Sequence, residues 1–335
     1  MRKRRMLMVL LAVSWLIGSA WAIDNKGITF EQPAADCFTL IEGGKATPIL
    51  LDEKDDVGIV IAAKNLQDDF RKVTGRQAEL LHSVRGPRLI VAGSLESRFI
   101  KELVKAKKID ITSLKGKREK YLMKAVSRPF DGVDEAWVVI GSDKRGTIYG
   151  IYELSEQIGV SPWYDWADVP VVQRKDLYIR RGEYTAGESA VKYRGIFLND
   201  EAPCLTGWVK HTYGTNYGDH RFYARVFELI LRLRGNFMWP AMWASSFYED
   251  DPANGQLADD MGIVMGTSHH EPMMRPHKDY TKRRKEVGPW NYATNKEGID
   301  SFFIEGAERS RKYESIVTIG MRGDGDVAMG GGTDE

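Results

Sequence analysis

The second half of the sequence repeats one order of elements: a short apolar run, a polar loop and a helix. The apolar runs lie at 193–198, 236–240, 262–266 and 315–321, and amphipathic helices are predicted at 222–234 and 300–313. The runs do not alternate apolar with polar residues, which is typical of parallel strands buried on both faces. The polar clusters follow the carboxyl ends of the strands, where a (β/α)8 barrel builds its active site.

The first half of the sequence predicts a smaller domain of mixed α/β or α+β type. Its helices are predicted at 59–73, ended by Gly75, and at 98–105 and 144–158, with strands at 78–81, 88–92, 121–126 and 136–140. Seven basic residues between Lys105 and Lys120 are interpreted as a solvated connector, and the small residues of 182–189 as a linker. Mixed elements of this kind predict one layered domain.

The amino terminus has the three parts of a secretory signal. A basic cluster at 2–5 precedes an apolar run at 6–17, and Ala20-Trp21-Ala22 forms an A-x-A cleavage site. The run is too short to span a bilayer, which requires about 20 residues. We therefore expect export to the periplasm or the cell exterior and no membrane association after cleavage.

Charge and cysteine content exclude several classes of protein. The 48 basic and 47 acidic residues give a formal charge of +1, and removing the four leader positives changes it to −3. Such a chain has no electrostatic reason to bind nucleic acid. Cys37 and Cys204 have no metal-binding spacing, and pairing between them is left open.

These observations predict three segments: a signal peptide at 1–22, a small α/β domain at 23–185 and a (β/α)8 barrel from 190 to 335. A barrel requires about 250 residues, whereas about 140 follow Tyr193. We therefore expect an amino-terminal fragment that is truncated after about four strands, with exposed strand edges.

The strand ends carry the side chains that glycosidic hydrolysis requires: carboxyl groups for acid and base, and aromatic rings for the sugar. They are Asn199, Asp200 and Glu201, then Trp239 and Trp243, then His269, His270 and Glu271, and finally Arg322, Asp324 and Asp326.

Other interpretations of these residues remain open. Asp200 or Asp326 can cap a helix or fix a turn, and the two tryptophans can fill the core. Adjacent histidines point apart on an extended loop, which disfavours a metal site. Residues 323–328 spell G-x-G-x-x-A, but the aspartates would repel a pyrophosphate, so we expect no cofactor.

Several strings together resemble glycoside hydrolase family 115, the xylan α-1,2-glucuronidases. They are 193–201 (YRGIFLNDE), 235–243 (GNFMWPAMW), 265–273 (MGTSHHEPM) and 320–326 (GMRGDGD), with 141–153 (GSDKRGTIYGIYE) upstream. The resemblance spans roughly residues 40–335. It implies an inverting enzyme, without metal chemistry, that releases (4-O-methyl-)glucuronic acid from xylose in glucuronoxylan. A homodimer of the full-length protein is also expected.

The resemblance assigns roles by position. Asp326 is expected to be the general base, and Arg322 to hold the uronate carboxylate or orient that base. Contacts to the substrate are expected from Glu156, Asn199, Asp200, Trp243, His269 and Asp324. By itself, Glu156 is typical of a solvated helical residue.

The chain departs from the family in one respect, because the family's general acid is a glutamate on a later strand than the sequence reaches. Two alternatives stay open. One is an inactive carbohydrate-binding protein, and the other is a metal-dependent hydrolase using His269, His270, Asp324 and Asp326.

Overall fold

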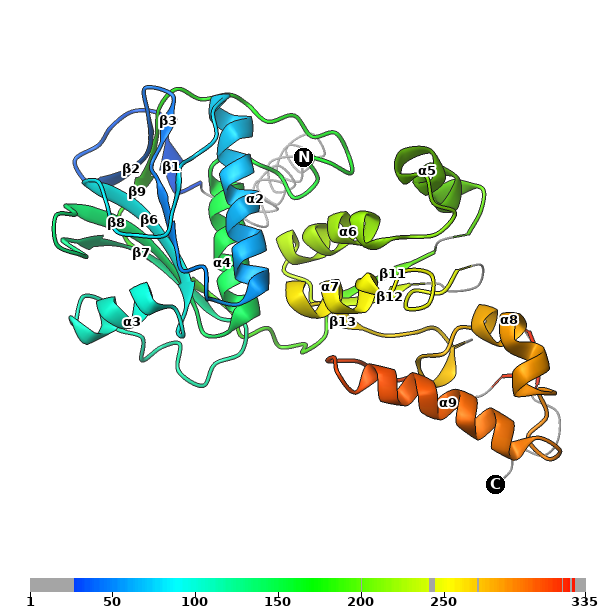
Figure 1. The fold of residues 1–335 in the computed structure, drawn as a ribbon. Coiled ribbons are helices and arrows are strands. Elements are labelled where there is room, and N and C mark those ends of the chain that lie inside the picture. Colours follow the sequence, from blue (N-terminus) through cyan, green and yellow to red (C-terminus); the bar gives the residue numbers. More distant parts are fainter. Residues whose placement is uncertain are drawn as a thin grey trace, which may run out of the picture.

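The computed structural model of the chain describes residues 27–199, 201–240, 245–269, 271–320, 322–325 and 327–328. In these residues the amino-terminal half forms two sheets and the remainder forms a third (Figure 1). None of the described helices is both long and apolar enough to cross a membrane.

The largest sheet has six strands. Their order is β10 (Glu183–Ala186), β7 (Tyr121–Ser127), β8 (Glu135–Gly141), β6 (Arg88–Ser94), β4 (Ile49–Leu51) and β5 (Leu80–Leu81). The last four are parallel to one another, whereas β7 is antiparallel to both of its neighbours. The central strands β6 and β8 are buried along all but their first residue because both faces are covered.

Successive residues of β6 point to opposite faces, and each face has its own helices. Ile90 and Ala92 belong to the same buried cluster as α2 (Val57–Thr74) and α4 (Lys144–Gln157). Leu89 and Val91 instead pack in the cluster that includes α3 (Arg98–Lys105). The sheet is therefore the middle layer of three.

The second sheet is antiparallel and smaller. It is ordered β1 (Thr29–Phe30), β9 (Leu177–Arg180), β2 (Cys37–Glu42) and β3 (Lys45–Ala46). Phe38 of β2 lies 5.9 Å, between ring centroids, from Trp137 of β8, so the two sheets contribute to one core.

The third sheet is parallel, and helices lie between its strands. Strands β11 (Gly195–Leu198), β12 (Phe237–Pro240) and β13 (Val264–Met265) lie in chain order. The helices are α5 (Cys204–Tyr213), α6 (His220–Arg232), α7 (Ala253–Met261), the short 3-10 helix η1 (Pro272–Met274), α8 (His277–Val287) and α9 (Lys296–Ser310). A parallel bridge joins Met265 to Ser315 and continues the order.

One apolar core runs through both halves of the molecule. It contains Leu66 of α2, Tyr152 of α4, Phe227 of α6 and Met238 of β12. In Figure 1, α2 and α4 lie between the amino-terminal sheets and the third sheet, and α8 and α9 lie at the far end. The two halves are therefore packed together through these helices.

The predicted helices at 59–73, 98–105, 144–158, 222–234 and 300–313 are confirmed, with bounds shifted by a few residues at most. The predicted end of α2 at Gly75 is confirmed as well. The Asp56 side chain accepts the N–H of Gly58 at the start of α2, and Gly75 ends that helix with φ of 74°.

Three sequence predictions are corrected. The 182–189 segment is not merely a linker, because β10 within it pairs with β7. The fourth strand predicted at 315–321 is reduced to the bridge at Ser315 within the described residues. Strand β11 is not buried on both faces, since Phe197 is 53% exposed. No described segment pairs with the second edge of β11, and this explains its exposure.

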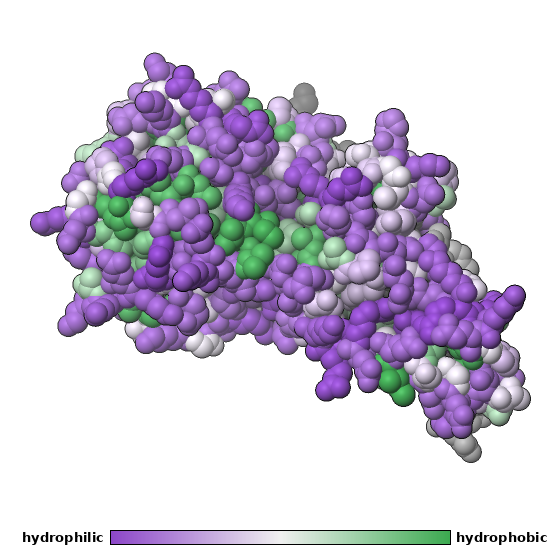
Figure 2. All heavy atoms as spheres, viewed as in Figure 1, coloured by the Kyte–Doolittle hydropathy of each residue, from purple (hydrophilic) through white to green (hydrophobic). Residues whose placement is uncertain are grey.

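On the face shown in Figure 2 most side chains are hydrophilic, and the larger hydrophobic patches lie over the amino-terminal half. The basic connector fits this picture, because Lys105, Lys107, Lys108, Lys115 and Lys117 are all exposed. Cys37 and Cys204 are both free thiols.

Gly195 permits the close pairing of β11 with β12. A Cβ atom at this position would lie 1.6 Å from the carbonyl oxygen of Phe237. We expect Gly195→Ala to lower the free energy of unfolding by about 1–3 kcal/mol, as overpacking does, in urea denaturation. Gly207→Ala on α5, where a Cβ would meet nothing within 4 Å, is the control. Equal stability of the two variants would contradict this account of β11.

Candidate active site at the carboxyl ends of the parallel strands

The carboxyl ends of β11, β12 and β13 lie at one edge of the third sheet, because the strands are parallel and in register. Phe197 pairs with Trp239, and Met238 pairs with Met265. The loops after these strands therefore begin side by side, as the sequence pattern predicts.

Asn199 directly follows β11 and is exposed. Its side-chain oxygen accepts the backbone N–H of Glu201 at 3.0 Å, which forms a local turn. Asp200, predicted to contact the sugar, lies outside the described residues.

Trp239 of β12 faces the side of the sheet opposite to the helices. Its ring lies 5.3 Å from the ring of Phe197, between centroids, whereas Met238 points into the helical core. The indole N–H of Trp239 is buried and has no hydrogen-bond partner among the described residues. Trp239 could fill the core, as one sequence interpretation allows, but the Phe197 ring beside it is exposed. That interpretation therefore stays open. Trp243 lies outside the described residues.

The loop after β13 is held by buried polar groups. Thr267 donates its hydroxyl to the carbonyl of Glu271 at 2.7 Å, and the Ser268 hydroxyl donates to the Glu271 carboxylate. Thr318 donates to the Thr267 carbonyl at 2.7 Å and connects the loop to the next segment of the sheet. His269 is exposed at the tip of this loop, and His270 lies outside the described residues. The residues on either side of His269 in this loop are thus fixed by hydrogen bonds.

Arg322 and Asp324 lie in a loop that α8 and the residues after it hold. Trp290 donates its indole N–H to the backbone carbonyl of Arg322 at 2.7 Å. The Asp324 carboxylate accepts from Nε2 of His277 at 2.8 Å and pairs with Arg284 at 2.6 Å. Asp326, the predicted base, lies outside the described residues.

The pKa of Asp324 is lowered below its ordinary value. Burial raises it, but the hydrogen bonds from His277 and Arg284 outweigh that effect. A depressed carboxyl pKa in the folded state means that the contribution of this contact to stability is present above about pH 4 and is lost as the pH falls through the lowered pKa.

Glu156 is not brought together with the other described candidates. It lies near the end of α4, where its carboxylate is 3.9 Å from the guanidinium of Arg234. Arg234 precedes β12, so Glu156 lies at the amino ends of the strands rather than at their carboxyl ends. The pKa of Glu156 is raised above its ordinary value, chiefly by burial and also by the nearby Glu153 carboxylate, and Arg234 only partly offsets this effect. Its predicted contact with substrate stays a prediction.

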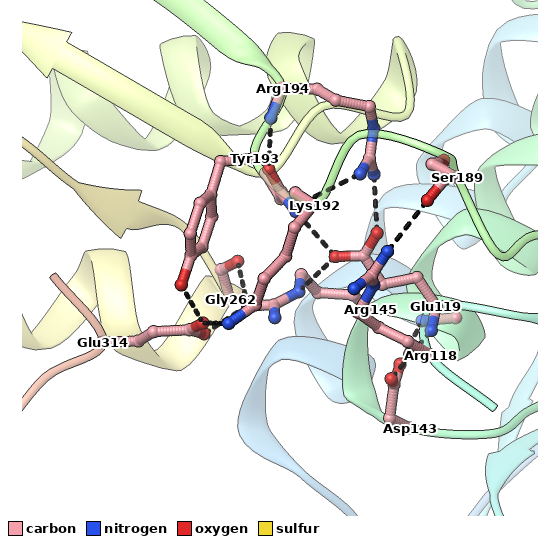
Figure 3. A network of polar contacts seen from close by, with 12 residues as sticks. Arg118, Glu119, Asp143, Arg145, Ser189, Lys192, Tyr193, Arg194, Gly262 and Glu314 are labelled. Atoms are coloured by element: carbon pink, nitrogen blue, oxygen red, sulfur yellow. Dashed lines mark hydrogen bonds and ion pairs between the residues drawn. The ribbon is translucent and has the colours of Figure 1, made fainter. Parts of the chain in front are cut away.

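At the amino ends of the strands, one buried carboxylate joins four segments of the chain (Figure 3). The Glu119 side chain, 1% exposed, accepts from Arg145 of α4 at 2.8 Å and from Arg194 before β11 at 2.7 Å. It also accepts from the amide of Asn236, before β12, at 2.6 Å. Arg145 in turn reaches Glu314 at 2.9 Å, just before the Ser315 bridge. This network fixes the small sheet domain against the starts of the parallel strands.

Sequence reasoning missed this network and the residues that hold the Arg322 loop. Glu119 lies within the basic stretch interpreted as a solvated connector, and nothing in its spacing indicates burial. His277 and Arg284 are seven residues apart, two helical turns, and this spacing places them on one face of α8. That spacing was the available signal, but the helix itself was not predicted.

The described residues contain no group of three or more His, Cys, Asp or Glu side chains placed to hold a metal ion. His270 and Asp326 of the metal-site hypothesis are outside this part of the chain, so the hypothesis stays untested.

Comparison with known proteins agrees with the resemblance seen in the sequence. Residues 186–335 match the model of Glycosyl hydrolase family 115. A solved structure of BtGH115A aligns with a TM-score of 0.74 and 31% identity, over 88% of this chain and 38% of that protein. BtGH115A is described as a family GH115 4-O-methyl-α-glucuronidase with specificity for decorated arabinogalactans. The chain therefore spans well under two thirds of that relative's length.

More distant similarities carry no argument. A β-hexosaminidase from Streptomyces plicatus and CpGH84D align at 10% identity with TM-scores of 0.42 and 0.36, each over 71% of this chain and over 44% and 42% of theirs. No curated protein matches the chain. The family match over 186–335, the 31% identical structure and the four sequence strings agree, and the chain belongs to glycosyl hydrolase family 115.

Proposed function

We propose that the protein is an α-glucuronidase that releases glucuronic acid or its 4-O-methyl ether from a plant polysaccharide. The observation that carries this proposal is the alignment with BtGH115A, a 4-O-methyl-α-glucuronidase, over 88% of the chain. Asn199 and His269 lie in the loops after β11 and β13, and Arg322 follows the Ser315 bridge. This placement after the parallel strands supports the same conclusion.

The proposed chemistry is inverting. Asp326 acts as the general base that activates water, and a glutamate on a later strand acts as the general acid. Arg322 binds the uronate carboxylate, because a guanidinium fork matches a planar carboxylate with two parallel hydrogen bonds. Asn199, Asp200, Trp243 and His269 contact the sugar.

We further propose that β11, β12, β13 and the Ser315 segment are the first part of a (β/α)8 barrel. Three observations support this: the parallel chain order, the intervening helices and the exposed Phe197 face, which a closed barrel would cover. Export through the 1–22 segment and a homodimer are part of the same proposal.

For the substrate, we propose glucuronoxylan with glucuronate α-1,2-linked to xylose. The specificity of BtGH115A for decorated arabinogalactans makes those the second candidate. The test is chromatographic detection of free (4-O-methyl-)glucuronic acid after the full-length protein is incubated with each polysaccharide, with and without a chelator. Release that survives chelation supports the proposal. Retention on either polysaccharide without release would instead indicate a carbohydrate-binding protein, and loss on chelation a metal-dependent hydrolase.

Replacing Arg322 tests the carboxylate contact. We expect Arg322→Ala to raise KM for a glucuronide by about 10- to 100-fold, since a hydrogen bond to a charged group contributes about 1.5–3 kcal/mol. The measurement is steady-state kinetics on a glucuronide and on its methyl ester, with exposed Arg311→Ala of the α9 end as the control. An equal loss on acid and ester would show that Arg322 does not bind the carboxylate.

A further inference from the structure

The loop that carries Arg322 is attached to α8 through Asp324. Oδ1 of Asp324 accepts from Nε2 of His277 at 2.8 Å and from Nη2 of Arg284 at 2.9 Å, and Oδ2 pairs with Nη1 of Arg284 at 2.6 Å. Both carboxylate oxygens are thus engaged by cationic or donor groups of one helix. A bidentate arginine contact also fixes the orientation of the carboxylate plane.

The helix that makes these contacts is itself well anchored. Tyr280, on the same helix, is buried, and its ring lies 4.5 Å from that of Trp290 and 6.3 Å from that of Phe302. The guanidinium of Arg284 lies over the Tyr280 ring at 5.0 Å. The two groups that bind Asp324 therefore project from a surface that aromatic packing supports.

A second anchor acts on the backbone of the same loop. Trp290 donates its indole N–H to the carbonyl of Arg322, and the N–H of Gly323 donates to the carbonyl of Val327 at 2.7 Å. The loop is thus held at the Arg322 backbone by Trp290 and at the Asp324 side chain by α8. These two anchors determine where the Arg322 side chain begins.

These contacts argue against the predicted role of Asp324 in binding the sugar. Its carboxylate already accepts two hydrogen bonds, from His277 and Arg284, and its second oxygen forms an ion pair with Arg284, so a sugar hydroxyl would have to compete with an arginine fork. Only 32% of the Asp324 side chain is exposed.

We propose that Asp324 is a positioning residue: His277 and Arg284 bind it so that its loop holds Arg322 in place for the uronate carboxylate. This inference rests on the proposed function. Asp326 lies two residues further along the chain, so the residue proposed as base belongs to the same short segment. A displacement of about 1 Å of a positioning group can cost about 100-fold in rate.

The test uses His277→Ala and Arg284→Ala in the full-length protein, with His211→Ala and Lys285→Ala as matched controls on exposed positions of α5 and α8. His277→Ala and Arg284→Ala are expected to raise KM for a glucuronide and to lower kcat, together by about 10- to 100-fold in kcat/KM. His277→Gln keeps an N–H donor at similar reach and is expected to restore most of that loss. A role in folding alone would not distinguish glutamine from alanine in this way.

A second readout does not depend on activity. Trypsin cleaves after arginine, so the rate of cleavage between Arg322 and Gly323, followed by mass spectrometry, reports whether the loop is held. We expect faster cleavage in His277→Ala, Arg284→Ala and Asp324→Asn, and the wild-type rate in both controls. Unchanged cleavage would show that His277 and Arg284 do not hold the loop. Faster cleavage with unchanged kinetics would show that holding the loop does not position Arg322. A wild-type protein that is inactive on every glucuronide would refute the proposed function, and with it the positioning role. The cleavage rate would still show whether Asp324, His277 and Arg284 hold the loop.

Discussion

Asp326→Asn is expected to lower kcat on glucuronides by about 10²- to 10⁴-fold, the contribution of a positioned general base. Asparagine keeps the shape of the side chain but cannot accept a proton from the attacking water. KM should change little, because the substitution affects the step in which water attacks rather than the binding of the carboxylate by Arg322.

The measurement is steady-state kinetics in the full-length protein across a range of pH. The acidic limb of the wild-type profile of kcat/KM reports the ionisation of the base, so it should be lost in the variant. Asp131→Asn, at an exposed position between β7 and β8, is the matched control. Full activity of Asp326→Asn would remove Asp326 from the mechanism.

Glu119→Ala is expected to lower the free energy of unfolding by about 3–5 kcal/mol, the cost of removing one partner from a buried ion pair. The substitution removes the carboxylate that pairs with both Arg145 and Arg194, and it leaves their two guanidinium groups without this partner. Their side chains are 17% and 21% exposed, so water only partly replaces the lost partner.

Urea denaturation measures this effect. Glu42→Ala is the control, because its carboxylate is 67% exposed and lies 3.5 Å from Arg88; exposed pairs contribute at most about 1 kcal/mol. The backbone of Glu119 has a φ of 55°, but glutamate and alanine both carry a Cβ atom, so this strain does not differ between them. A loss below 1 kcal/mol for Glu119→Ala would show that the network does not hold the two halves together.

The helices that sequence periodicity predicts are those with a strong apolar face and a clear end. Helix α2 has such a face and a glycine that stops it, and α6 buries one long side against the core. Helix α8 has the sequence HKDYTKRRKEV, and its buried residues are Asp279, Tyr280 and Val287. With so little apolar surface it has no period to detect, and the residues that hold Asp324 were missed with it.

Three short strands, β1, β3 and β10, were also missed. Strand β10 has the sequence EYTA between Gly182 and Gly187, which is typical of a linker, and it becomes a strand because β7 offers an edge. Its pairing depends on a segment about 60 residues away, which local pattern cannot indicate. The strands β1 and β3 have two residues each, too few to show alternation.

The order of the parallel strands was predicted better than the contacts that hold the candidate site, and the roles of the site residues stay predictions. The loop positions of Asn199 and His269 after β11 and β13 followed from the parallel pattern, because the direction of such strands determines where their loops meet. Arg322 instead follows the single bridge at Ser315. The contacts of Glu119 join residues 26 to 117 positions apart, and those of Asp324 join residues 40 and 47 positions apart. Such long-range pairs follow from the tertiary fold and not from spacing along the chain.

The central proposal is that the full-length protein is an inverting α-glucuronidase. The most direct test is a proton NMR time course of the full-length protein with a glucuronoxylo-oligosaccharide, which reports both the release of the uronic acid and its first anomer. The account predicts that free glucuronic acid is formed first as the β-anomer, because inversion at an α-linked centre gives that configuration. Binding of the oligosaccharide without any free uronic acid would contradict the claim, and first formation of the α-anomer would contradict inversion.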